Sequence, residues 1–384
     1  MRTVAALHLS EPSGPSRTLT PVLRDLAATG DVIVAVPGPG GAADELRSVG
    51  RIAVTRHEAL VRPRTAVEAV TLPARLRQDA RRFRTLLRRE RADLAIIATR
   101  TLPALTLAAW LERVPSVLYL TELYDPGLGG NASQALAWRR LVALQARLAG
   151  CVVTPTRLVA AGIPASVPTV VAAPPIDPAV ADGDAAALRR RHGIPDTRPV
   201  LATMGNITRP RGQDVALRAL ALLRAAFPGA RLIVAGAVHA RGPDVAFEQE
   251  LRGLASELGL DGAVHFCGFE NPADVVAAAD VFVNPARVAE SFGRASMEAL
   301  VAGTPVVSTA VGAVPDVLAD EREALLVPPE SPGAVAAAVR RLLDEPGLVE
   351  RLVAAGRGRV LTEYTAERQV ARFGEAIRLA EAGA

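Results

Sequence analysis

The fold is indicated most clearly by the stretch Asn284-Pro285-Ala286-Arg287-Val288-Ala289-Glu290-Ser291-Phe292-Gly293-Arg294-Ala295-Ser296-Met297-Glu298-Ala299-Leu300-Val301-Ala302-Gly303-Thr304-Pro305-Val306-Val307 of this 384-residue chain. An apolar segment over 280–284 leads into a polar loop, and the pattern predicts a helix that begins near Gly293. Gly303-Thr304-Pro305 predicts the end of that helix and the start of another apolar segment. A buried strand, a loop, a helix and a further strand in this order are typical of a parallel sheet covered by helices.

The same alternation of apolar and amphipathic segments extends along the rest of the chain. It restarts after the proline-rich segment 173–178, which can continue neither a helix nor a sheet. Each half opens with a strand, a polar loop, a helix and a strand, and in the first half we expect the loop over 10–17 and the helix over 18–28. The predicted strands include 3–9, 31–36, 51–54, 93–98, 116–120, 151–154, 199–204, 231–235 and 280–284. This pattern predicts an α/β protein with two Rossmann-like domains rather than one large sheet.

The composition excludes several kinds of chemistry. Every one of the 44 basic residues is Arg, so a Schiff-base lysine or a P-loop lysine is impossible. The two cysteines, Cys151 and Cys267, are too few for a disulfide framework and lie in apolar runs, which fits a reducing cytoplasm. The N-terminus becomes polar too early for a signal peptide, and four prolines interrupt the uncharged stretch 158–176. We therefore expect a cytoplasmic protein.

Charge is distributed unequally between the two halves. Residues 1–180 carry 22 Arg and 14 acidic residues, a formal charge of +8, whereas residues 181–384 carry −4. The excess is concentrated in segment 75–91, where Leu76, Ala80, Phe83 and Leu87 fall at helical spacing. This segment is either a solvated surface helix or a contact with an anionic membrane surface or acceptor, and the sequence leaves both open. Nucleic-acid binding is not expected, because the basic half has no interleaved aromatic residues and no recognised motif.

The loop before the predicted helix has the residue types that a phosphorylated, hydroxyl-rich ligand needs. Ser291, Phe292 and Gly293 can present free amide N–H groups at a helix N-terminus, where phosphate binds well. Glu290 and Glu298 flank this position, and their carboxylates are poor phosphate ligands but good acceptors for hydroxyl groups. A ligand with both kinds of group is a nucleotide sugar.

These residues resemble the mark of the retaining glycosyltransferases of GT-B architecture, specifically family 4 (group 1). That mark is two glutamates with seven residues between them, followed by Ala-x-x-Ala/Cys-Gly-x-Pro-Val and a Gly-Gly-x-Pro-Glu loop. The matching residues here are Glu290, Glu298, Ala299, Ala302, Gly303, Pro305 and Val306, with the later loop reading Gly312-Ala313-Val314-Pro315-Asp316. The resemblance implies that Glu298 binds the ribose hydroxyls of the donor and that Glu290 faces the hydroxyls of its sugar.

A second family mark is Gly-Arg followed by Lys-Gly, whose cations hold the donor diphosphate. The matching run is Gly205-Asn206-Ile207-Thr208-Arg209-Pro210-Arg211-Gly212, with Arg211 at the lysine position and Asn206 at the arginine position. Arg209 is expected to compensate for Asn206. The resemblance implies a catalytic pair of Glu290 and Arg211, and a diphosphate stabilised by arginines requires no metal ion.

The first domain matches the family mainly in plan. Gly14, in a loop after the first strand, and Phe269, in the second domain, are predicted to contact the donor as well. Thr121 stands where the family usually has His, and His8 is interpreted as an ordinary strand residue. The predicted acceptor-side residues are Ser13, Arg17, Thr121 and Glu122.

Two other motifs favour different chemistry. Asp182-Gly183-Asp184 has the form of a metal-binding acid pair, but capping of the following helix by Asp184 explains it better. Gly38-Pro39-Gly40-Gly41-Ala42-Ala43 satisfies the loose dinucleotide fingerprint, with Glu58 about 20 residues further on. This is the basis of the alternative function, an NAD(P)-dependent oxidoreductase. The fingerprint follows the second predicted strand instead of the first, which disfavours this alternative.

The sequence as a whole predicts a two-domain GT-B enzyme whose domains face each other across a cleft. Residues 1–176 are expected to form the acceptor side, residues 177–364 the donor side, and residues 365–384 a helix that returns to the first domain. The expected reaction transfers a sugar from a nucleotide-diphosphate sugar to an acceptor hydroxyl with retention of configuration. No metal ion and no cofactor are expected.

Overall fold

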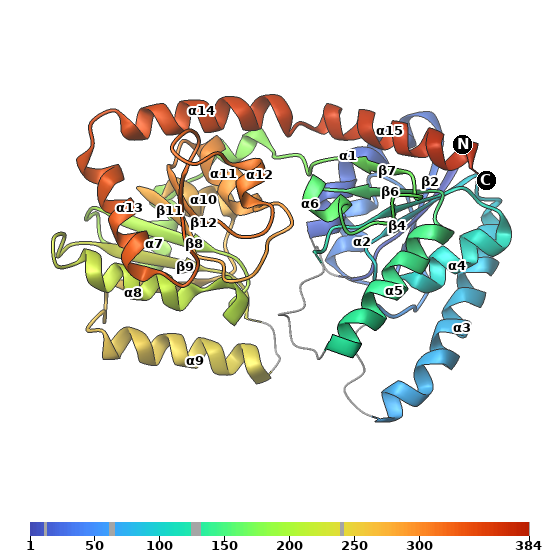
Figure 1. Cartoon of the computed structure of the whole chain (residues 1–384), viewed down its shortest axis with the longest axis horizontal. Coiled ribbons are helices and arrows are strands. Elements are labelled where there is room, and N and C mark those ends of the chain that lie inside the picture. The colour runs from blue at the N-terminus through green and yellow to red at the C-terminus, as the bar shows by residue number, and fades with distance from the viewer. Residues whose placement is uncertain (11–13, 61–65, 124–131, 239–241, 384) are drawn as a thin grey trace. The chain divides into compact units, whose positions relative to one another are not determined.

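The structure is a computed structural model that describes residues 1–10, 14–60, 66–123, 132–238 and 242–383. It divides the chain into two compact units. Unit 1 comprises Met1–Pro175 together with Ala366–Ala384, and unit 2 comprises Ile176–Thr365. Each unit is built on its own parallel sheet (Figure 1).

Unit 1 contains a seven-stranded sheet with the order β3-β2-β1-β4-β5-β6-β7. Every pair of neighbouring strands in it is parallel. The inner strands consist mostly of Val, Ile, Leu and Ala and are buried on both faces, as expected for a sheet between two layers of helices. Their bounds are β1 Arg2–Ala6, β2 Asp31–Val36, β3 Arg51–Val54, β4 Leu94–Ala98, β5 Ser116–Tyr119, β6 Cys151–Thr154 and β7 Thr169–Val171.

Helices cover both faces of this sheet. Apolar residues of α1, α2 and α15 form one buried cluster with the strands, and those of α3, α4 and α5 form another on the opposite face. The bounds are α1 Gly14–Thr29, α2 Gly41–Leu46, α3 Ala66–Glu90, α4 Pro103–Glu112, α5 Ala132–Leu148, α6 Arg157–Ala160 and α15 Ala366–Ala382.

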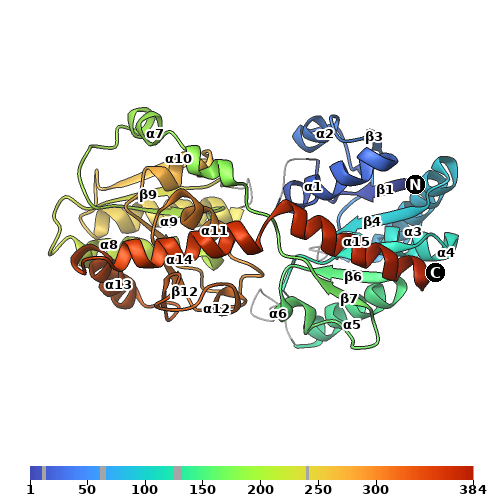
Figure 2. The same cartoon turned by 90° about the horizontal axis from the view of Figure 1, so that it is seen from above.

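The C-terminal helix α15 belongs to unit 1, although most of unit 1 is formed by the first 175 residues. It contacts α1 and strands β5, β6 and β7 (Figure 2). Phe373 is fully buried, and its ring lies 5.4 Å from that of Tyr119 on β5 in an edge-to-face arrangement. The predicted return of the last helix to the first domain is confirmed.

Unit 2 contains a six-stranded parallel sheet with the order β10-β9-β8-β11-β12-β13. Helices α8, α9 and α13 form the largest buried cluster with this sheet, while α10 and α11 contact each other elsewhere in the unit. The strand bounds are β8 Val200–Met204, β9 Arg231–Ala235, β10 Val264–Gly268, β11 Val281–Asn284, β12 Val306–Thr309 and β13 Leu325–Val327. The helix bounds are η1 Pro178–Asp182, α7 Ala185–His192, η2 Arg209–Arg211, α8 Gln213–Leu223, α9 Gly242–Glu257, α10 Pro272–Ala277, α11 Arg294–Ala302, α12 Val314–Val317, α13 Pro332–Asp344 and α14 Leu348–Glu363.

The predicted class of two Rossmann-like domains is confirmed, since both sheets have the doubly wound strand order. The predicted loop over 10–17 is wrong in part, because helix α1 begins at Gly14 rather than at Thr18. Pro15 is tolerated there because the first helical turn needs no amide hydrogen from it. The Thr18 hydroxyl also donates to the Gly14 carbonyl at 2.7 Å, which satisfies an acceptor in this turn.

Candidate functional site

The two residues predicted to be catalytic lie together in unit 2. Arg211, at the end of η2, forms an ion pair with Glu290, in the loop between β11 and α11. The Asn284 side chain, at the end of β11, donates from Nδ2 to the Glu290 carboxylate at 2.6 Å. The Arg211 side chain is 45% exposed and that of Glu290 is 11% exposed, so the cation is the more accessible partner. The loops that follow β8 and β11 therefore place a cation and a carboxylate at the carboxyl edge of the sheet, where parallel sheets bind ligands.

The backbone of Glu290 is fixed by the loop that follows β12. The amide of Ala313 donates to the Glu290 carbonyl at 2.8 Å. Gly312 adopts a positive φ of 60°, and a Cβ at this position would lie 2.4 Å from the Glu290 amide nitrogen and carbonyl oxygen. Only glycine fits here without displacing Glu290. The sequence resemblance included Gly312 but did not reveal that its function is to hold Glu290.

The N-terminus of α11 follows directly on this loop. Gly293 caps the helix in the left-handed conformation with φ 79°, so the helix begins where the sequence predicts it. The Phe292 side chain is buried, and its ring lies 5.0 Å from that of Tyr364, which fixes the loop against the end of α14. Ser291 is half-buried, and Ser296 has a buried hydroxyl with no hydrogen-bond partner among the described residues. Any role of Phe292 in ligand binding thus rests on its backbone.

Glu298 lies in the second turn of α11 and is only 7% exposed. Arg294, one turn earlier, donates from Nε to the Glu298 carboxylate at 2.8 Å. This contact neutralises a carboxylate that would be costly to bury alone, and it orients the side chain.

The end of β8 is shaped by two glycines. Gly205 has φ 139°, and its carbonyl lies so close to Gly236, which follows β9, that a Cβ on Gly236 would be 1.8 Å from that oxygen. Asn206 is exposed, and its carbonyl accepts from the Gln213 side chain at 3.0 Å. The role of Gly236 could not be predicted from the sequence, because the contact joins residues 31 positions apart.

Arg209 does not lie with Arg211. Its guanidinium donates to both carboxylate oxygens of Glu250, at 2.7 and 2.5 Å, and lies 5.2 Å from the Phe247 ring centre on α9. In this structure Arg209 therefore does not compensate for the arginine that Asn206 replaces. Phe269, immediately after β10, is 68% exposed and has no ring contact among the described residues.

Sequence reasoning missed Arg287, which organises the base of the same loop. It pairs with Asp214 on α8 and, at 3.0 Å, with Glu330. Its backbone amide also donates to the Pro210 carbonyl at 2.9 Å, which ties the β11 loop to η2. The Asp214 carboxylate raises the pKa of Arg287. A fixed pair of this kind supports the loop that holds Arg211 but leaves no charge over for a ligand.

The predicted acceptor-side residues lie in unit 1. Arg17 is exposed in the first turn of α1, as is Gly14, which was predicted to contact the donor, and Ser13 lies outside the described residues. Thr121 and Glu122 follow β5, and the Glu122 Oε2 atom is buried without a hydrogen-bond partner among the described residues. Burial raises the pKa of the Glu122 carboxyl, while nearby Arg100 opposes the shift.

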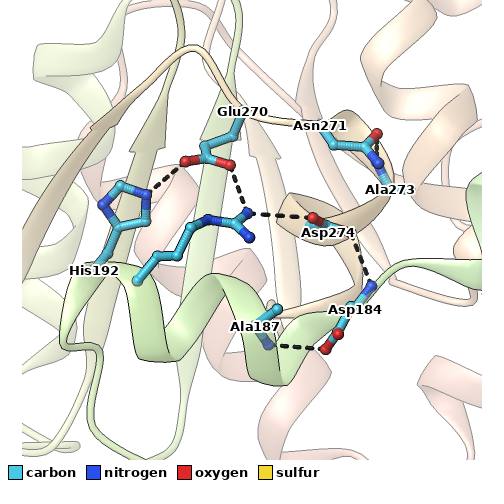
Figure 3. Close-up of polar contacts among 8 residues, drawn as sticks. Asp184, Ala187, His192, Glu270, Asn271, Ala273 and Asp274 are labelled. Atoms are coloured by element: carbon cyan, nitrogen blue, oxygen red, sulfur yellow. Dashed lines mark hydrogen bonds and ion pairs between the residues drawn. The ribbon is translucent and has the colours of Figure 1, made fainter.

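The acid pair after the proline-rich segment is structural. Asp184 accepts a hydrogen bond from the Ala187 amide at 2.8 Å, so the predicted cap of α7 is confirmed. Asp274 accepts from the Asp184 amide at 2.8 Å and, with Glu270, pairs with Arg191 (Figure 3). Within the part of the chain that the structure describes, no cluster of His, Cys, Asp and Glu is suited to hold a metal ion.

The dinucleotide fingerprint at Gly38–Ala43 also has a structural explanation. The amide of Ala42 donates to the Ser10 carbonyl at 2.9 Å and that of Ala43 to the Gly40 carbonyl at 3.0 Å. Two of the amides that a pyrophosphate would need are thus already hydrogen-bonded to backbone carbonyls. The helix that follows, α2, has only six residues.

The family model described as glycosyl transferases group 1 matches residues 184–359 of this chain. A D-inositol 3-phosphate glycosyltransferase of Streptomyces griseus is 38% identical over 183 residues, which is 46% of this chain and 39% of that protein. The enzyme of the same name from Stackebrandtia nassauensis is 36% identical over 217 residues, or 53% of this chain and 48% of that protein. The matched part thus spans less than half the length of these relatives.

Solved structures resemble the whole chain. HepE of Anabaena, in complex with UDP-glucose, has a TM-score of 0.83 at 17% identity and covers 98% of this chain and 99% of its own. Sucrose-phosphate synthase of Thermosynechococcus elongatus has a TM-score of 0.79 at 21% identity and covers 100% of both chains. At this level of identity the likeness establishes the GT-B fold alone. Among the described residues, no helix combines the length and the apolar character needed to cross a bilayer.

Proposed function

Because the family model of the glycosyl transferases group 1 matches residues 184–359, we propose that the chain is a retaining, metal-independent glycosyltransferase. It transfers a sugar from a nucleotide-diphosphate sugar to the hydroxyl group of an acceptor. The donor binds to residues 177–364 and the acceptor mainly to residues 1–176, with residues 365–384 returning to the first domain.

The observation that supports this proposal most strongly is the contact between Arg211 and Glu290 at the carboxyl edge of the unit 2 sheet. A guanidinium is the best side chain for a diphosphate, because its fixed donors match the phosphate oxygens. A carboxylate beside it accepts hydrogen bonds from sugar hydroxyls. Asn284 keeps that carboxylate in place when the diphosphate competes for Arg211.

Negative charge accumulates on the diphosphate as the sugar leaves, so Arg211 stabilises the transition state more than the ground state. The amides at the start of α11 add positive potential near the same loop. Glu298 accepts hydrogen bonds from the ribose hydroxyls, and its bond to Arg294 orients it for this purpose. By family resemblance, the acceptor hydroxyl attacks on the face of the leaving group, and the departing phosphate takes its proton.

The alternative of an NAD(P)-dependent oxidoreductase gains no support, because amides of the Gly38–Ala43 loop are used within unit 1. We place the enzyme in the cytoplasm. Its Arg-rich segment 75–91 contacts the anionic inner face of the membrane, and nucleic acid is not a ligand.

The proposal is tested with a panel of UDP- and GDP-sugars and product analysis by mass spectrometry and NMR. One nucleotide should raise the melting temperature while NAD does not, since only a ligand of the folded state stabilises it. The product should have the anomeric configuration of the donor, and EDTA should leave the rate unchanged. Stabilisation by NAD alone, inversion of configuration or a strict need for a divalent ion would each contradict the proposal.

A further inference from the structure

An apolar groove lies on the helical face of unit 1, in a part of the molecule that the proposed reaction does not use. Its volume is about 560 Å³, within the range of small-molecule sites. Helix α4 contacts both α3 and α5 (Figure 1). Residues of all three helices line the groove. The walls are formed by pairs of leucines from each helix: Leu72, Leu76, Leu107, Leu111, Leu141 and Leu144.

Several of these leucines remain in contact with water. Leu107, Leu111 and Leu144 are 38%, 43% and 54% exposed. Trp110, 54% exposed, lies three residues after Leu107 and is its neighbour on the surface of α4, because residues three and four apart share a helix face. Contiguous exposed apolar surface of this kind marks an interaction site. Trp beside aliphatic residues is typical of a surface that meets the boundary of a bilayer.

The rim of the groove is positively charged. Arg77, Arg81 and Arg84 of α3 line it. Arg84 is paired with Glu112, whereas Arg77 and Arg81 are exposed and have no ion pair among the described residues. A ligand that seats a hydrocarbon chain between the leucines therefore brings its head group to two unpaired guanidinium groups, which favour an anion.

The wall also contains one unsatisfied polar atom. Gln145 lines the groove and is 2% exposed. Its Nε2 donates to the Thr106 hydroxyl at 3.0 Å, but its Oε1 is buried with no hydrogen-bond partner among the described residues. A buried acceptor without a donor is costly, so the ligand that completes this site carries a hydroxyl group.

We propose that this groove binds an anionic, hydroxyl-bearing lipid of the bilayer, with a hydrocarbon chain between α3, α4 and α5 and its head group at Arg77 and Arg81. This inference goes beyond the glycosyl transfer proposed above and does not depend on it. It concerns unit 1 only, so its failure and that of the proposed reaction are distinguishable. It also resolves the two interpretations of segment 75–91 in favour of the membrane.

The two tryptophans of the chain, Trp110 and Trp138, both lie in helices that form the groove, α4 and α5. Neither side chain lines the groove, but both lie on the helices that bound it, so their fluorescence reports on a lipid that meets this face. Wild-type protein is mixed with vesicles of phosphatidylcholine and phosphatidylglycerol in which the acyl chains of the phosphatidylglycerol are brominated. Bromine quenches by contact, so we expect quenching with these vesicles and none with vesicles of phosphatidylcholine alone. Binding to the anionic vesicles without quenching would contradict the proposal.

A matched pair of double variants tests the residues. The groove variant combines Arg81→Gln with Leu144→Glu. The control combines Arg218→Gln with Leu222→Glu on α8 of unit 2, where Leu222 is 55% exposed and thus comparable with Leu144. The groove variant should lower the vesicle partition coefficient about tenfold or more, and the control should leave it within about twofold. Equal effects of the two variants would overturn the proposal.

A second groove variant, Arg77→Gln with Leu111→Glu, repeats the test in case the first does not fold, as judged by circular dichroism. Sedimentation addresses the other occupant of an apolar surface, a second copy of the chain. A wild-type dimer that the groove variants convert to a monomer would assign the groove to self-association and reject the lipid. A wild-type protein that is monomeric and binds the vesicles would support the lipid proposal.

Discussion

Units 1 and 2 have the same scaffold but different chemistry on it. In both, the first strand of the unit lies between the second and the fourth, and all pairs are parallel. In unit 2 the carboxyl edge of this sheet has an ion pair, Arg211 with Glu290, and glycines with positive φ that include Gly205, Gly293 and Gly312. In unit 1 the loop after β3 has a different ion pair, Glu58 with Arg75, and the positive φ after β4 belongs to Thr99. Two sheets of one topology thus differ in function through their loops.

On the helical faces it is unit 1, rather than unit 2, that has the candidate binding site. Unit 1 has the apolar groove with its unpaired Arg77 and Arg81, whereas α9 of unit 2 carries polar contacts such as that of Arg209 with Glu250. The proposed binding site of unit 1 therefore lies on its helical layer, and that of unit 2 lies at the edge of its sheet. The following predictions test this contrast, from the largest expected effect to the smallest.

The largest effect concerns the helix that completes unit 1. Phe373→Ala removes a fully buried ring that packs on Tyr119. Loss of a buried Phe costs about 3–5 kcal/mol, so we expect the melting temperature of the transition that contains unit 1 to fall by at least about 6 °C. Calorimetry of the variant measures this change. Leu379→Ala on the same helix is the control, since Leu379 is 39% exposed and should matter little.

If Phe373→Ala leaves that transition unchanged, α15 does not stabilise unit 1. A change confined to a separate transition of unit 2 would have the same meaning. Either outcome would show that α15 is not part of what stabilises unit 1.

The next effect concerns the sheet edge of unit 2. Arg211→Ala should lower kcat about 10²-fold or more and also weaken donor binding, because the cation acts on charge that develops in the transition state. Steady-state kinetics with the identified donor measures both constants. Arg209→Ala is the matched control from the same 3₁₀ helix, and its activity should remain near normal because its guanidinium is bound to Glu250. Equal losses in the two variants would show that the ion pair with Glu290 is not what makes Arg211 important.

A smaller effect is expected at Glu298. Bonds from ribose hydroxyls to this carboxylate are equally strong in the ground and transition states, so Glu298→Ala should raise the donor KM about tenfold with little change in kcat. Arg294→Ala is the companion variant, since it removes the partner that orients the carboxylate. It should raise KM less than Glu298→Ala does. An unchanged donor KM in a folded Glu298 variant would reject the ribose role.

The contrast between the units also explains what could be predicted from the sequence. The strands and most helices followed from apolar periodicity, because burial on both faces leaves a continuous pattern. Glu290, Gly293 and Glu298 lie within one short segment, so their motif was visible. Gly236 close to Gly205, and Gly312 against the backbone of Glu290, are contacts between loops of different strands. The groove could not be predicted, since it depends on which faces of α3, α4 and α5 remain uncovered.

The smallest effect concerns Glu122, the one described acceptor-side carboxyl with a buried, unpartnered oxygen. Burial raises its pKa above the ordinary value of 4.5. Between that value and the raised pKa, the folded state holds a proton that the unfolded state has released, so stability falls as the pH rises through this window. Glu122→Gln removes the penalty, and the variant should melt at a higher temperature than wild type at pH 7. The difference should vanish as the pH falls below 4.5, where both states of the wild type become protonated.

Melting curves of both proteins from pH 4 to 8 test this prediction, with Glu112→Gln as the control in unit 1. Arg84 and Arg88 pair with Glu112 and lower its pKa, so this substitution should leave stability unchanged or reduce it at neutral pH. Kinetics with the identified acceptor separates a binding role from a merely structural one. If Glu122 contacts the acceptor, Glu122→Gln raises the acceptor KM and leaves the donor KM unchanged. A variant with a higher melting temperature and unchanged kinetics would remove Glu122 from the acceptor site. Unit 1 would then retain Arg17 and Thr121 as its described acceptor-side candidates.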